Sequence, residues 1–141
     1  MTQEQKELLM KDLSARLPYG VKLQISSWDD TNMEYVDKAD TLYSISSDNH
    51  IRTSSEDRDY YIDEVKPYLF PMSSMSDEQK KEYNLWKHLV PVCHYEYGDV
   101  VEEYELFDSP GSFEYLIANH FDDRGLIDKG LAIDATYLNI Y

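Results

Sequence analysis

The chain has 141 residues with 28 acidic and 13 basic side chains, which give it a formal net charge of −15. This length matches one globular domain, residues 1–141, and the lone Cys93 excludes an internal disulfide and a multi-cysteine zinc site. The acidity disfavours direct binding to nucleic acid or anionic lipid, and no apolar run approaches the ~20 residues that span a bilayer, so we expect a cytoplasmic protein.

The first half of the chain predicts one helix followed by short strands. Thr2 with Gln5 is a capping-box pattern, and the apolar helix face that follows it ends at Pro18. Strands are predicted where apolar and polar residues alternate, over residues 21–25, 42–45, 50–53 and 60–65, with the second and third forming a hairpin. The prolines within residues 66–71 exclude a helix interior there.

The second half predicts two more helices and two strands between them. Ser76 is followed three residues later by a capping glutamine, and the helix it starts is expected to run to about Val90, because Pro91 stops it. Ser109 precedes a proline at the first position of a third helix. The strands between these helices are predicted at residues 92–97 and 100–106. The tail beyond residue 126 has no clear period.

These elements predict an α+β fold, with about three helices packed on one face of a mostly antiparallel sheet of four to six strands. The predicted core consists of the apolar residues on the inner side of each pattern. They are Leu9, Leu13, Leu17, Val21, Leu23, Leu42, Ile45, Leu69, Trp86, Leu106, Phe113, Leu116, Ile117 and Phe121.

The most unusual segment is residues 88–123, which hold nine carboxylates and no lysine or arginine. Strand alternation puts Glu103 and Glu105 on the solvent side, and neighbouring tyrosines can serve as aromatic anchors. The predicted binding face consists of Tyr95, Glu96, Tyr97, Glu102, Glu103, Tyr104 and Glu105. We expect this face to bind a basic protein surface, which makes the protein a non-enzymatic interaction or accessory module.

Two other interpretations of the acidic residues are open. Carboxylates on a rigid surface can imitate DNA phosphates, so the protein could inhibit a host nucleic-acid-binding enzyme as a DNA mimic. Alternatively, the acids form an ordinary solvated face that keeps an exposed sheet edge from pairing with other chains. The sequence does not specify an oligomeric state.

A third functional hypothesis is a metal-assisted enzyme at residues 119–125, where His120 and Asp122 are the candidate ligands. The competing interpretation is helix termination, with His120 and Arg124 near the negative end of the helix dipole and Asp123 turning the chain. The sequence contains no EF-hand loop, phosphate-binding loop, zinc-binding helix or nucleophile elbow. We therefore predict no cofactor, and the sequence identifies no catalytic residue, so an enzyme is the less favoured interpretation.

Three segments spread along the chain carry a resemblance to known sequences. They are residues 1–21, 65–75 and 119–132, which include Leu-Pro-Tyr-Gly-Val, Lys-Pro-Tyr-Leu-Phe-Pro and Asn-His-Phe-Asp-Asp-Arg-Gly. They resemble a family of small uncharacterised proteins encoded by gut anaerobes and by their phages or other mobile elements. The resemblance implies no activity, ligand or catalytic residue. It implies an accessory or host-interaction protein.

Overall fold

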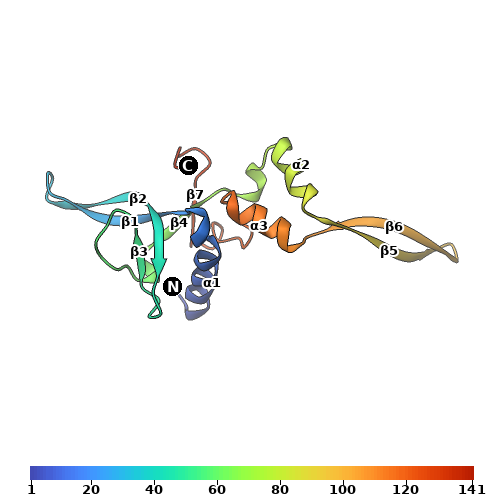
Figure 1. The fold of residues 1–141 in the computed structure, drawn as a ribbon, viewed down its shortest axis with the longest axis horizontal. Coiled ribbons are helices and arrows are strands. Elements are labelled where there is room, and N and C mark those ends of the chain that lie inside the picture. Colours follow the sequence, from blue (N-terminus) through green and yellow to red (C-terminus); the bar gives the residue numbers. More distant parts are fainter.

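The computed structural model describes residues 1–141 as an α+β protein with three α-helices, a five-stranded sheet and a separate two-stranded sheet. The molecule is elongated, with the larger sheet at one end, the helices in the middle and the two-stranded sheet projecting at the other end (Figure 1). The α+β class predicted from the sequence is confirmed.

The larger sheet has the strand order β3-β2-β1-β4-β7 and is antiparallel except for the parallel pair β4 and β7. Its strands are β1 (Lys22–Asp29), β2 (Glu34–Ile45), β3 (Ile51–Thr53), β4 (Lys66–Leu69) and β7 (Ile133–Asp134). The predicted hairpin is the β2–β3 pair. The strand predicted over residues 60–65 is wrong, because the Glu64 carboxylate accepts a hydrogen bond from the Tyr61 N–H and closes a 3-10 turn there.

Each of the three helices begins at a capping box, as the polar residues at their starts indicate. The helices are α1 (Gln3–Arg16), α2 (Asp77–Leu85) and α3 (Pro110–Ala118), and their N-caps are Thr2, Ser76 and Ser109. In α2 the prediction fails at the other end. The helix ends at Leu85, and Pro91 lies inside the following strand instead of terminating the helix.

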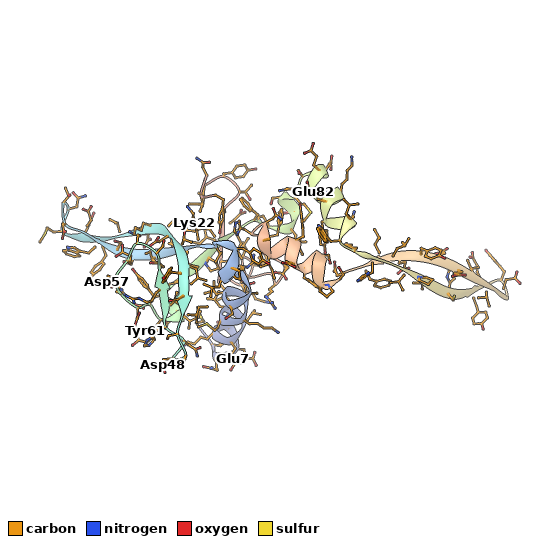
Figure 2. All side chains as sticks on the ribbon, viewed as in Figure 1. Glu7, Lys22, Asp48, Asp57, Tyr61 and Glu82 are labelled. Carbon is orange, nitrogen blue, oxygen red and sulfur yellow. The ribbon has the colours of Figure 1, made fainter.

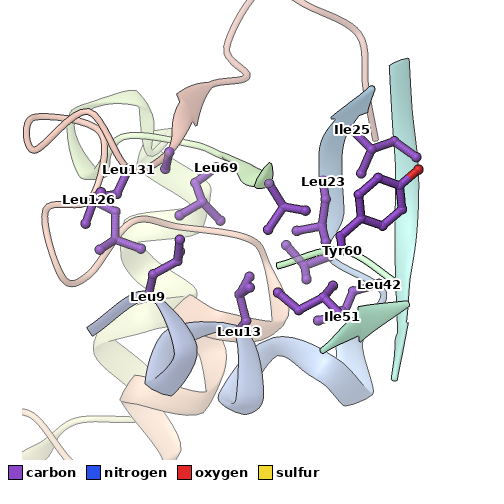
Figure 3. Close-up of a cluster of buried hydrophobic side chains, with 13 residues drawn as sticks. Leu9, Leu13, Leu23, Ile25, Leu42, Ile51, Tyr60, Leu69, Leu126 and Leu131 are labelled. Atoms are coloured by element: carbon purple, nitrogen blue, oxygen red, sulfur yellow. The ribbon is translucent and has the colours of Figure 1, made fainter. Parts of the chain in front are cut away.

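The main core lies between α1 and the larger sheet (Figure 3). The apolar face of α1 supplies Leu9 and Leu13, and the loop after residue 125 supplies Leu126, Leu131 and Ala132, although that stretch shows no apolar period. The remaining members are Val21, Leu23, Ile25, Leu42, Ile51, Tyr60, Val65 and Leu69. The C-terminal loop therefore completes the core that the first helix begins.

Helix α1 packs on the larger sheet, whereas α2 and α3 pack on each other beyond it, which differs from the expected packing of all three helices on one sheet face. Helices α2 and α3 enclose a smaller cluster in which Met75, Leu116 and Phe121 are buried. Three residues assigned to the core are exposed instead, namely Trp86 at 56%, Leu106 at 49% and Phe113 at 45%. They lie where the helix pair meets the projecting hairpin, which has no layer to cover them.

Candidate functional site

The acidic segment forms a projecting antiparallel hairpin, which we call the arm. It consists of β5 (His88–Glu96) and β6 (Asp99–Phe107) and leaves the body between α2 and α3 (Figure 1). The side chains along it point into solvent on both sides (Figure 2), and none of them is buried. The two predicted strands are therefore present, but neither has a buried face.

The tip of the arm is a two-residue turn formed by Tyr97 and Gly98, whose φ angles are 52° and 85°. Positive φ at both positions matches a type I′ turn, which suits the right-handed twist of a hairpin and favours glycine at its second residue. Pro91 lies opposite Tyr104. A proline is tolerated there because a two-stranded sheet has open edges, where its missing N–H interrupts no further ladder.

The strand register sorts the arm into two chemically different faces. Residues directly opposite each other in an antiparallel pair share a face, and successive residues alternate between faces. One side, which we call the acidic face, carries Glu96 opposite Asp99, with Glu103 and Glu105 further along. The other residues on this side are His88, Val90, Val92, His94, Val101 and Phe107. The other side, the apolar face, carries Leu89, Pro91, Cys93, Tyr95, Val100, Glu102, Tyr104 and Leu106.

All seven residues of the predicted binding face lie on the arm, but they do not form one surface. Glu96, Glu103 and Glu105 are on the acidic face, whereas Tyr95, Glu102 and Tyr104 are on the apolar face. Tyr97 is at the tip and is 98% exposed. The pleat separates them because they occur at both odd and even positions along each strand.

Sequence reasoning missed Asp99 as a member of the acidic face. The signal that identifies it is the two-residue turn, because such a turn pairs Glu96 directly with Asp99. The imidazole of His94 lies on the same face, with its Nε2 3.8 Å from the Glu96 carboxylate. With no lysine or arginine between residues 88 and 123, the acidic face has a concentrated negative potential.

In the second candidate site, residues 119–125, the candidate ligands His120 and Asp122 make contacts that stabilise the fold. The carboxylate of Asp122 accepts hydrogen bonds from the Leu126 N–H at 2.8 Å and the Ile127 N–H at 2.9 Å, so both of its oxygens hold the following loop. The imidazole of His120 stacks on Tyr141 with ring centroids 3.8 Å apart. No group of three or more His, Cys, Asp or Glu side chains is arranged to hold a metal ion.

A buried ion-pair cluster connects α1 to this same loop. Arg16 is fully buried and donates through Nε to the Asp12 carboxylate at 2.8 Å. Its Nη2 donates to the Phe121 carbonyl at 2.7 Å and to the Asp123 carboxylate at 3.1 Å. Burial raises the pKa of Asp123, although the positive charges of Arg16 and Arg124 oppose this. The cluster therefore holds the loop in place, a role that we did not predict.

Comparison with protein-family models, with curated proteins and with solved structures finds no match to this chain. None of the helices has both the length and the apolar character needed to cross a membrane.

Removing the arm is expected to leave the body folded, because no arm residue belongs to either core cluster. We expect a variant with a short Gly-Ser link in place of residues 89–106 to unfold cooperatively, with a free energy of unfolding within ~1 kcal/mol of the wild type. Urea denaturation followed by circular dichroism measures this difference. Loss of the cooperative transition would show instead that the arm is part of the folding unit.

Proposed function

We propose that this protein is a non-enzymatic interaction module, acting in the cytoplasm, that binds a basic partner through the acidic face of the arm. The observation that carries the proposal is the placement of four carboxylates on one face of a projecting hairpin that has no lysine or arginine. These carboxylates are not needed to hold the body together, because the arm contributes nothing to the core clusters.

The projection of the arm supports this role. A charged group on an extended element meets an approaching partner before the body does, so attraction acts early in the encounter and raises the association rate. Salt weakens such attraction, since the Debye length falls to about 3 Å at 1 M ionic strength. Tyr95 and Tyr104 on the apolar face, exposed at 81% and 62%, add aromatic contact area if a partner encloses the hairpin.

The test compares two variants with the same charge change. The arm variant is Glu96→Gln, Asp99→Asn, Glu103→Gln and Glu105→Gln. The control variant neutralises four exposed acids of the body, Glu7→Gln, Asp48→Asn, Asp63→Asn and Glu78→Gln. The probe is a twelve-residue peptide of alternating arginine and glycine, and stopped-flow fluorescence measures its association rate at low ionic strength.

We expect the arm variant to associate about tenfold more slowly than the wild type, because a localised field steers the peptide. The control variant is expected to lose less than threefold, since its four charges are spread over separate elements. In 1 M salt the three proteins are expected to associate at similar rates. Equal losses in the two variants at low salt would contradict the proposal, because net charge alone would then explain the attraction.

A further inference from the structure

At the foot of the arm, two adjoining hollows of about 280 and 270 Å³ share Trp86 and Tyr115 in their linings. The first is also lined by Glu114, and the second by Glu82, which is labelled on α2 in Figure 2. We call the two hollows together the Trp86 groove. It lies between α2 and α3, just before the chain enters β5.

The indole of Trp86 is held at the groove and yet stays accessible. Its backbone carbonyl accepts a hydrogen bond from the Ser109 hydroxyl, and its ring lies against Gly111. A Cβ added at Gly111 would come within 3.1 Å of the Trp86 ring. Glycine weakens a helix relative to alanine, and the backbone of Gly111 needs no positive φ, so close approach of the indole accounts for the glycine in α3. The ring is still 56% exposed.

The charge of the groove is uncompensated. Glu82 accepts a hydrogen bond from the Tyr115 hydroxyl at 2.9 Å, and Glu114 accepts one from the Tyr19 hydroxyl at 2.6 Å. Neither carboxylate forms an ion pair with a lysine, arginine or histidine. The nearby Lys87 is directed elsewhere, with its ammonium 4.4 Å from the centre of the Tyr83 ring.

We propose that the Trp86 groove binds a guanidinium group on an apolar stem, namely an arginine side chain of the basic partner. A guanidinium is planar and stacks on indole, and it pairs with carboxylates through several donors. Leu85 and Ala118 in the groove lining offer apolar contact to the stem. The assignment of the guanidinium to a side chain of the basic partner rests on the proposed function, whereas the ability of the groove to bind a guanidinium does not.

The first experiment uses Trp86 as its own reporter. The chain has two tryptophans, so a Trp28→Phe background leaves Trp86 as the only one. N-acetylarginine methylamide is titrated into this protein and indole fluorescence is recorded. The control ligand is N-acetylcitrulline methylamide, which has nearly the same shape and no charge. We expect a saturable change with the arginine derivative only. An equal response to both ligands, or no saturation with either, would overturn the assignment.

Two variants then test which groups bind the cation, with NMR chemical shifts as the readout. Replacing the indole by an aliphatic side chain in Trp86→Leu is expected to weaken binding of the arginine derivative about three- to fivefold. The double variant Glu82→Gln with Glu114→Gln is expected to weaken it about fivefold. The matched control is Glu7→Gln with Asp48→Asn, which removes the same number of charges from exposed acids outside the groove and is expected to bind this small ligand as the wild type does. Unchanged affinity in both groove variants would overturn the site.

The source of the cation is tested with the arginine-glycine peptide. We expect the peptide to bind more tightly than the single arginine derivative and to lose affinity in the Glu82→Gln, Glu114→Gln protein. Equal affinities would overturn the assignment to a partner side chain and would favour a free organic cation. The small-ligand titration does not involve the arm, so the groove and the proposed arm function can fail separately.

Discussion

Replacing Arg16 with methionine is expected to lower the free energy of unfolding by about 3–5 kcal/mol, because Asp12 and Asp123 would lose the buried guanidinium that pairs with both of them. Asp12 is fully buried, and its Oδ2 would lose the donor that now lies at 2.8 Å. Its remaining charged partner would be Arg124, whose Nε lies 3.3 Å from the Asp12 Oδ1. The Phe121 carbonyl and the Asp123 carboxylate would each lose a hydrogen bond as well. Urea denaturation at pH 7.5, followed by circular dichroism, measures the loss.

Lys11→Met is the matched control, because Lys11 is exposed on the same helix and has no ion pair, and its effect is expected to stay within ~0.5 kcal/mol. Combining Arg16→Met with Asp12→Leu is expected to restore part of the lost stability, since the buried Asp12 carboxylate, which would otherwise keep only its contact with Arg124, is then removed as well. A loss below ~1 kcal/mol for Arg16→Met alone would show that the cluster contributes little.

Acidification from pH 7.5 to pH 5 is expected to lower the free energy of unfolding by about 2 kcal/mol through His120. Burial, together with the positive charge of Arg16, lowers the pKa of His120 from 6.5 to about 4. Between these two values the unfolded chain binds more protons than the native protein does. Stability from the neutral imidazole is therefore complete above pH 6.5 and is lost as the pH falls towards 4.

The pH dependence of stability in the wild type is compared with that of the variant His120→Asn, because asparagine tolerates the φ of 64° at this position. We expect the variant to be less stable at pH 7.5, where it lacks the stack on Tyr141, but to show a flatter pH dependence. Asp123 acts in the opposite direction, since its raised pKa favours the native state on acidification above pH 3.8. Keeping to pH 5 and above avoids the pI of about 4.4. Parallel pH profiles would contradict the role assigned to His120.

The starts of the helices could be predicted from the sequence because helix capping is a local interaction. Thr2, Ser76 and Ser109 each cap the helix that follows within three residues. The end of α2 could not be predicted in the same way. Pro91 disrupts a helix, but it is equally compatible with a two-stranded hairpin, and only the tertiary arrangement distinguishes the two.

The part of the candidate site that depends on local sequence could be predicted as well. Alternation within a strand separates Glu103 and Glu105 from Tyr104, and the structure agrees. Which residues of β5 join each face depends on the register across the turn, and this is fixed by the pairing of Glu96 with Asp99. The exposure of Trp86 was not predictable, because an apolar residue at a helical spacing is usually buried. Helix α2 ends at Leu85, so Trp86 follows the helix and does not lie on its buried side.

The buried guanidinium also constrains the order in which the chain assembles. The hydrogen bonds from Arg16 to Phe121 and Asp123 join residues 105 and 107 positions apart. Contacts between such distant residues form slowly, because the entropy of closing the loop opposes them before they form. During synthesis, α1 can form early from its own capping box and its apolar face can pack on the first strands, but Arg16 can reach these two partners only after residues 121–123 have been made.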